Sequence, residues 1–451
     1  MNSELNSKAV WICNTDVESE WALADNIEMP NRGIRQVIFN YFEEILLSSI
    51  GPSNIAILRK NPDSAFVDYL KSLGVSLPKI LVAGAEAKKP WLPTSQIVIQ
   101  NPSLIRSLSD QASKRKITVL ESFGVSNLIE QIARLSGLSI SYSGSEISKF
   151  ISRKSFSRDI AKKVGLHIPD GQVCYNLMDL TKVVKTVRSK GRGAPVVIKP
   201  ELGASGRGQF IIWEQQDIDR LDAMINRGDL KIYGTAFVVE RWYSKSVTLS
   251  YEFHVDQNEH IPKAIKLRET LKDKDKRDYG YIYPAEAESN LLNKIQKASN
   301  SLTMELREQH QYNGPVRCDA LLLPDKRLFP VLELNARHSF FHFIDMIHEK
   351  LAPQCIGLFC WFFFRFPGHI RFDEFIEKNI GKELLFTPDR QEGVVVPVWR
   401  TVIATEGIED LDDVYPLRRL FVLILATTKE RATKIALIIR EKLERHNDTN
   451  F

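Results

Sequence analysis

Three oxygen-bearing side chains stand close together in the second half of the sequence. Asp319 lies in an apolar run, Glu333 follows 14 positions later in the next run, and Asn335 is two positions further on. Because side chains alternate between the faces of a strand, Glu333, Asn335 and Arg337 share one face. Mg²⁺ prefers oxygen ligands, and a nearby arginine can oppose developing negative charge. The pattern predicts a magnesium site; the simpler interpretation is that these acids face solvent.

A glycine-rich segment between two other apolar runs could hold phosphate. It contains Gly203, Ser205, Gly206 and Gly208, and glycine lets backbone amides approach an anion closely. The spacing fits neither GxxxxGK[ST] nor GxGxxG, and strand-like residues on both sides predict a hairpin tip. Lys199 precedes the loop and could reach a phosphate as a point charge. The segment predicts a flap over a nucleotide; an ordinary turn beside a surface lysine is the alternative.

The elements that must position these residues begin with an N-terminal region, residues 1–148. Short apolar runs alternate there with stretches of helical spacing. Strands separated by crossover helices predict an open parallel sheet covered on both faces. The helical stretches are 34–49 and 64–73, and the strands are 10–13, 55–58, 79–82, 97–99 and 118–120.

Hairpin-like strands replace this alternation in residues 149–350, and residues 351–451 read as a smaller α+β module. The apolar run 355–366 is predicted to be a core helix, with an interdomain or homodimer interface as the alternative. The helices expected are 149–164, 181–189, 291–310 and 429–446, and the strands are 195–200, 209–213, 236–241, 247–255, 316–323, 328–334 and 419–426.

The composition excludes several classes of protein. The 451 residues are 43% hydrophobic and 26% charged, as in ordinary folded proteins. With 61 basic and 56 acidic residues the chain is nearly neutral, which argues against a nucleic-acid partner. Five cysteines without a CxxC pair predict a reducing compartment. The N-terminus has no signal-peptide pattern, and the run 356–364 is far shorter than the roughly 20 residues that cross a bilayer. We expect a cytoplasmic protein without a membrane partner.

Four motifs in this order resemble the ATP-grasp ligase superfamily. They are Lys154 ahead of a helix, VIKP with the glycine loop at 197–208, VVERWY at 238–243, and D…ELNAR between 319 and 337. The resemblance covers residues 145–345. Segments 246–251 and 281–284 and the end after Pro416 are similar to ATP-grasp peptide ligases of natural-product biosynthesis, such as the pheganomycin type. The resemblance implies an ATP-grasp fold with an N-terminal open parallel α/β domain and a small C-terminal α+β cap.

The resemblance also implies bound ATP with Mg²⁺ or Mn²⁺. Lys154 and Lys199 match the lysines that contact the nucleotide. Glu240, Trp242 and Tyr243 match the hinge strand beside adenine. The family often places an acid for the ribose hydroxyls a few positions after the hinge, but segment 243–248 has none. The metal ligands implied are Asp319, Glu333 and Asn335.

The reaction implied by the resemblance activates a carboxylate. The γ-phosphoryl group of ATP passes to the carboxylate, and an amine attacks the resulting acyl phosphate to form an amide. Arg268 is the candidate for contacting the transferred phosphate, and Arg337 for holding the acyl phosphate or the tetrahedral oxyanion. The expected substrates are an amino acid or small peptide and an amine. A kinase on the same scaffold and a nucleotide-binding regulator without turnover are the alternatives.

Overall fold

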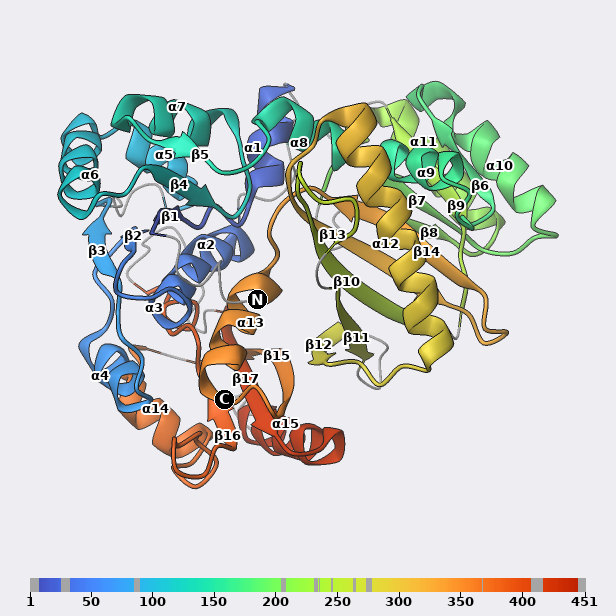
Figure 1. Cartoon of the computed structure of the whole chain (residues 1–451). Helices are drawn as coiled ribbons and strands as arrows, with labels where there is room; N and C mark the ends of the chain where they lie inside the picture. Colours follow the sequence, from blue (N-terminus) through green and yellow to red (C-terminus); the bar gives the residue numbers. More distant parts are fainter. Residues whose placement is uncertain are drawn as a thin grey trace.

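The computed structural model describes the chain in several stretches: residues 8–25, 33–84, 90–203, 208–230, 234, 236–244, 246–262, 265–272, 278–366, 368–406 and 417–444. They build one parallel and two antiparallel sheets (Figure 1). None of the helices in these stretches has the length and apolar character needed to span a membrane.

The N-terminal sheet confirms the predicted parallel α/β arrangement. Its five strands run in the order β3-β2-β1-β4-β5, the outcome expected when crossover helices separate consecutive strands. The strands are β1 (Val10–Ile12), β2 (Ile55–Leu58), β3 (Lys79–Val82), β4 (Val119–Ser122) and β5 (Ser139–Ile140). The helices among them are α1 (Val17–Ala24), α2 (Ile34–Asn40), η2 (Tyr41–Ile45), α3 (Leu46–Ser49), α4 (Ser64–Ser72), α5 (Thr94–Ile99), α6 (Pro102–Arg115) and α7 (Asn127–Ser136).

A four-stranded antiparallel sheet carries the glycine-rich hairpin. Its order is β6-β9-β7-β8, and two helices bury their apolar faces against it. The pairing of β7 with β8 confirms the predicted hairpin. The elements are β6 (Gly171–Cys174), η3 (Leu177–Asp179), α10 (Leu180–Lys190), β7 (Val196–Pro200), β8 (Phe210–Ile212), α11 (Gln215–Arg227) and β9 (Phe237–Arg241).

The largest sheet has eight strands in the order β14-β13-β10-β11-β12-β15-β17-β16. Helices α9 (Lys154–Lys163) and α12 (Ser289–His310) cover one side of it around β10, β13 and β14 (Figure 1). The strands are β10 (Val247–Val255), β11 (Lys266–Lys272), β12 (Asp278–Tyr283), β13 (Gly314–Leu322), β14 (Leu328–Asn335), β15 (Ile356–Arg365), β16 (Gly393–Val395) and β17 (Leu417–Ala426). The other helices are α8 (Ser145–Ile151), α13 (Phe340–Leu351), α14 (Phe372–Asn379) and α15 (Lys429–Glu444).

Three sequence-based expectations about secondary structure are wrong. The run 97–99 lies in helix α5, and the run 355–366 forms strand β15 rather than a core helix. Short apolar runs do not distinguish buried helix from buried strand, and the aromatic content of β15 favours a strand between β12 and β17. The helix expected at 149–164 is two helices, α8 and α9, which end and begin on either side of Ser152 and Arg153.

A shared core joins the N-terminal sheet to the C-terminal strands. One cluster of buried side chains contains Trp21 and Phe42 together with Phe359 and Trp399. Glu44 fixes this junction, because its carboxylate accepts hydrogen bonds from the backbone N–H groups of Trp399 and Arg400 at 2.8 and 2.6 Å. The two ends of the chain therefore fold into one body at this side of the molecule.

Glu20 of α1 supports a pH-dependent prediction. Burial raises its pKa from 4.5 to about 7, although hydroxyl donors on Ser126 and Ser95 lower it. A raised pKa contributes stability fully below pH 4.5 and loses it as pH rises through 7. From pH 5 to 8 the wild type should therefore lose about 2.5 kcal/mol relative to Glu20→Gln. Thermal unfolding of both proteins at pH 5, 6.5 and 8 measures this, and parallel pH curves would contradict it.

Candidate functional site

The two predicted metal-binding carboxylates lie directly opposite each other. Asp319 on β13 pairs with Glu333 on β14, and Arg317 pairs with Asn335. The intervening residues Cys318 and Leu334 are buried in the core on the other face of the sheet, so the polar set shares one face as the sequence predicted.

An irregularity in the hairpin sets this register. Leu321 pairs with Phe329, but the ladder shifts between Leu321 and Asp319. Pro330 lies in the shifted stretch of β14, and proline has no N–H to donate to the ladder. Without the shift, Asp319 would face Val331 rather than Glu333. The shift in the ladder near Pro330 therefore places the two carboxylates opposite each other.

Lys154 binds to this pair from the first residue of α9. Its Nζ lies 3.2 Å from Oε1 of Glu333 and donates to the carbonyl oxygen of Gly203 at 2.8 Å. The helix is fixed against β14, because the hydroxyl of Ser157 accepts the Leu334 N–H at 2.9 Å. Lys154 is buried, and its two contacts connect β14 to the start of the glycine-rich loop.

Lys199 and Glu240 form a second charged group close by. Nζ of Lys199 lies 2.7 Å from Oε2 of Glu240, whose other oxygen lies 2.9 Å from Nη1 of Arg158. Arg158 belongs to α9 and also donates to the carbonyls of Pro169 and Gly171. The carboxylate of Glu240 thus bridges two cations from different elements.

The neighbouring charges at this site change the pKa of the Glu333 carboxyl group. Burial raises its pKa, the charge of Lys154 opposes the rise, and the negative charge of Asp319 adds to it. Lys199 is also close enough to lower the pKa of Glu333. Two carboxylates and two lysines predicted from separate motifs therefore converge in one place.

The rest of the predicted nucleotide-binding set is only partly described. Gly203 and Gly208 adopt positive φ angles of 132° and 71°, which favour glycine. Ser205 and Gly206 lie outside the described residues. In the hinge, the backbone N–H of Trp242 donates to Pro195 at 2.8 Å, and Arg241 packs over the ring of Tyr243.

The two predicted catalytic arginines have different surroundings. Arg337 lies beside the carboxylate pair, with its Nη2 at 3.2 Å from Oδ1 of Asn335. Its Nε and Nη2 also donate to Glu18 of α1 at 3.0 and 2.5 Å. Arg268 is buried two strands from Asp319, and its guanidinium is engaged by Asp345 and Glu252.

Sequence reasoning missed two charged residues in the site. Arg317 donates to Oδ1 of Asp319 at 2.8 Å and to Ser250 at 2.9 Å. Its position two residues before Asp319 places it on the same face, so strand alternation could have identified it. Glu18 could not have been found this way, because 319 positions separate it from Arg337.

The donor set fits a hard divalent cation. Asp319 and Glu333 offer carboxylate oxygens from opposite positions, where side chains of paired strands approach closely, and Asn335 adds an amide oxygen. The charge of Asp319 raises the pKa of Glu333, and a bound cation would relieve that repulsion. Within the described ranges, no three His, Cys, Asp or Glu side chains could hold a metal ion by themselves. The site would therefore need the amide and phosphate oxygens.

Similarity to a curated protein covers part of the chain. No protein-family model matches the sequence. A [butirosin acyl-carrier protein]–L-glutamate ligase from Niallia circulans is 23% identical over 297 residues, which are 65% of this chain and 64% of that protein. The chain thus spans less than two thirds of the length of this relative.

Solved structures match the chain over almost its whole length. Biotin carboxylase from Campylobacter jejuni, in a β,γ-ATP complex, has a TM-score of 0.54 at 12% identity. The match covers 100% of this chain and 97% of the biotin carboxylase chain. An ADP complex of N5-carboxyaminoimidazole ribonucleotide synthetase has a TM-score of 0.52 at 13% identity, and the match covers 91% of this chain and 96% of the synthetase chain. An L-amino acid ligase from Bacillus licheniformis has a TM-score of 0.50 at 13% identity, and the match covers 97% of this chain and 98% of the ligase chain. With the order of the four motifs, these matches show that the chain has the ATP-grasp fold.

Proposed function

We propose that this protein is an ATP-dependent carboxylate–amine ligase that forms an amide through an acyl phosphate. The observation that carries the proposal is the convergence of Asp319, Glu333, Lys154 and Lys199 where the two antiparallel sheets meet. Opposed carboxylates suit a divalent cation, and the lysines suit the phosphates of ATP. Magnesium, when bound, would neutralise phosphate charge.

The first step transfers a phosphoryl group. An oxygen of the substrate carboxylate attacks the γ-phosphorus of ATP, the bond to the β-phosphate oxygen breaks, and ADP leaves. Lys154 and Lys199 offset the charge of the phosphates, and Arg268 adds positive charge two strands away. Catalysis of such a step is mainly positioning and electrostatics.

The second step forms the amide. The amine attacks the carbonyl carbon of the acyl phosphate, loses a proton, and phosphate leaves. Arg337 lies beside Asn335 and presents a planar guanidinium, which is suited to a phosphate or an oxyanion. Glu18 holds this guanidinium in place through two hydrogen bonds. The flap at 203–208 is proposed to exclude water from the intermediate.

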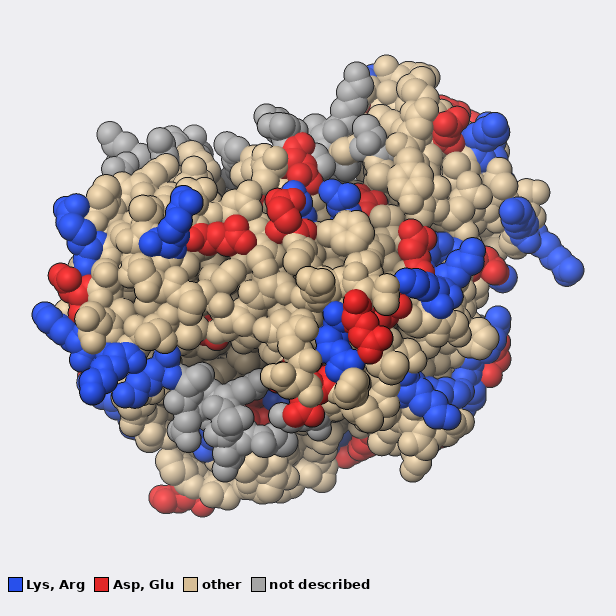
Figure 2. Space-filling model, turned by 45° about the horizontal axis from the view of Figure 1, so that its top comes forward, with Lys and Arg blue, Asp and Glu red and all other residues tan. Residues whose placement is uncertain are grey.

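The relatives support this choice of reaction. One is named a ligase of L-glutamate and an acyl-carrier protein, and another an L-amino acid ligase. We therefore propose an amino acid or small peptide as substrate, ADP as a product, and a role in specialised metabolism. We propose no nucleic-acid partner, because the chain is nearly neutral and positive and negative side chains are interspersed on the one face that Figure 2 shows. Homodimer formation and a cytoplasmic location remain parts of the proposal.

One assay separates a ligase from a kinase and from a regulator. The protein is incubated with ATP, Mg²⁺ and pooled amino acids and amines, and ADP, free phosphate and new amide masses are measured. A ligase releases phosphate in step with amide formation. A stable phosphorylated product without free phosphate would favour a kinase, and no ATP turnover would favour a regulator.

Glu333→Gln tests the carboxylate pair. The substitution keeps the shape of the side chain but removes the charge that pairs with Lys154, so we expect kcat to fall about 100-fold or more. Steady-state ADP release measures this, and Glu441→Gln on the exposed side of α15 is the matched control. Wild-type kcat in Glu333→Gln would contradict the assignment.

Arg337→Lys tests the proposed oxyanion contact. Lysine retains the charge but loses the planar fork, so we expect kcat to fall about 100-fold while the KM for ATP stays unchanged. The exposed Arg327→Lys serves as the control. Amide formation measured over a range of ATP concentrations separates the two parameters. A raised KM for ATP with normal kcat would instead place Arg337 on the nucleotide.

A further inference from the structure

A buried arginine at the edge of the parallel sheet has no bonded partner. Arg59 directly follows β2 and is 0% exposed. Within the part of the chain that the structure describes, its Nε, Nη1 and Nη2 atoms make no hydrogen bond. A guanidinium carries five N–H donors and keeps its charge in proteins, so leaving all of them unmade in a buried place is costly.

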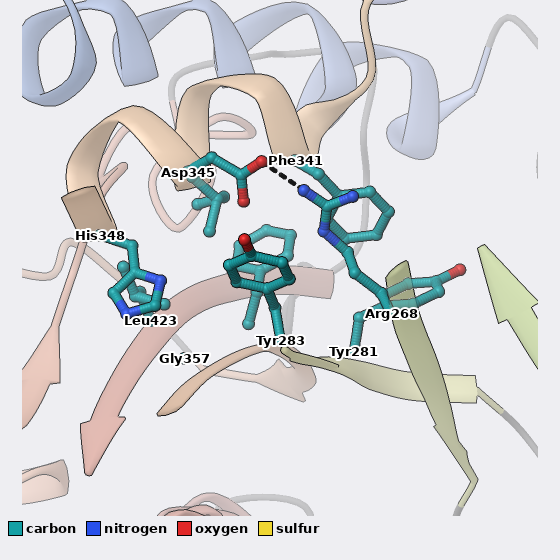
Figure 3. A pocket seen from close by; sticks show the side chains of 10 residues that line it. Arg268, Tyr281, Tyr283, Phe341, Asp345, His348, Gly357 and Leu423 are labelled. Carbon is teal, nitrogen blue, oxygen red and sulfur yellow. Dashed lines mark hydrogen bonds and ion pairs between the residues drawn. The ribbon is translucent and has the colours of Figure 1, made fainter. Parts of the chain in front are cut away.

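The other fully buried arginines among the described residues are paired with carboxylates. Arg268 donates to Asp345, the contact drawn as a dashed line in Figure 3. Arg418 lies 2.8 Å from Oε1 of Glu406 through its Nη1, and it also donates to backbone carbonyl oxygens. A buried guanidinium is thus placed against a carboxylate at both of these positions, and Arg59 is the exception.

The carboxylate of Glu43 on η2 does not supply the missing acceptor. Its Oε1 accepts the backbone N–H of Arg59, and its Oε2 accepts the hydroxyl of Thr94. Burial raises the pKa of Glu43 to about 7, although the charge of Arg59 opposes the rise. Burial also lowers the pKa of Arg59, and the charge of Glu43 opposes this only in part. Glu43 therefore holds the backbone of Arg59 and leaves the guanidinium without a bonded partner.

An aromatic ring and a second cation lie beside Arg59. Its Cζ is 5.7 Å from the centre of the Tyr41 ring, and Nζ of Lys60 is 5.9 Å from the same centre. Lys60 is exposed, so the ring that contacts Arg59 lies close to the protein surface. A ring face attracts a cation but cannot accept the bonds of a whole guanidinium. Two cations at one ring indicate that the missing partner is an anion.

The position of Arg59 in the sheet is one where ligands bind. In open α/β sheets, ligands lie outside the carboxyl ends of the strands. Strand β1 pairs with β2 on one side and with β4 on the other, so Arg59 after β2 is two strands from Phe123 after β4. Two strand spacings amount to about 10 Å. The guanidinium of Arg337 packs over the ring of Phe123 at 5.2 Å, so Arg59 lies along the same edge of the sheet as the candidate site but apart from it.

We propose that Arg59 anchors a binding site for an oxyanion, either a carboxylate or a phosphate group, between the carboxyl edge of the parallel sheet and η2. The planar fork of the guanidinium matches two oxygens of such a group through parallel hydrogen bonds. Lys60 adds a second positive charge close by. The site uses none of the residues assigned to the nucleotide or the metal, so it does not depend on the proposed ligase reaction.

Thermal unfolding in sodium acetate and in sodium phosphate tests the site, with sodium chloride keeping the ionic strength constant. Arg59→Met removes the charge, whereas Arg59→Lys keeps the charge but loses the fork. Arg106→Met is the matched control, because Arg106 is exposed on α6. An anion that binds only the folded protein raises the unfolding temperature as its concentration rises. The difference between the wild type and Arg59→Met removes any binding of phosphate at the nucleotide site.

We expect at least one oxyanion to raise the unfolding temperature of the wild type and Arg106→Met by about 2 °C more than that of Arg59→Met. Arg59→Lys should respond less than the wild type. The larger response, to acetate or to phosphate, identifies the ligand group as a carboxylate or a phosphate. An equal response of the wild type and Arg59→Met to both oxyanions, including no response, would overturn the proposal. Should Arg59→Met not fold, an equal response of the wild type and Arg59→Lys would overturn it.

Discussion

The ion pair between Lys154 and Glu333 is the interaction on which the site depends. It connects the first residue of α9 to β14, and the same ammonium group donates to the carbonyl of Gly203 at the start of the glycine-rich loop. Because an unpaired charge is costly to bury, the ammonium group of Lys154 stabilises the buried carboxylate of Glu333 and opposes the rise in its pKa that burial causes. Lys154 therefore ties the sheet that carries the glycine-rich loop to the sheet that carries Asp319 and Glu333.

The other charged side chains of the site are also paired with a group of opposite charge. Lys199 is held by Glu240, Arg337 by Glu18, and Asp319 by Arg317. Each cation proposed to meet a phosphate is thus neutralised by a carboxylate before ATP binds. The site can therefore be both charged and buried.

Much of this site could be predicted from the sequence, but its register could not. Strand alternation placed Glu333, Asn335 and Arg337 on one face, and the glycine spacing predicted the hairpin. The pairing of Asp319 with Glu333 depends on the ladder shift near Pro330, which no periodicity reveals. The contact between Glu18 and Arg337 depends on how the parallel sheet packs against the rest of the chain. The run 355–366 forms strand β15 rather than the predicted helix, and a continuous apolar run carries no period that distinguishes the two.

The transfer of oxygen from substrate to phosphate tests the proposed reaction most directly. A carboxylate substrate labelled with ¹⁸O in both oxygens is converted with ATP and an amine, and the released phosphate is analysed by mass spectrometry. An acyl phosphate intermediate requires one labelled oxygen in each phosphate molecule, with the other retained in the amide. Phosphate without label would show that the carboxylate is not phosphorylated and would contradict the account.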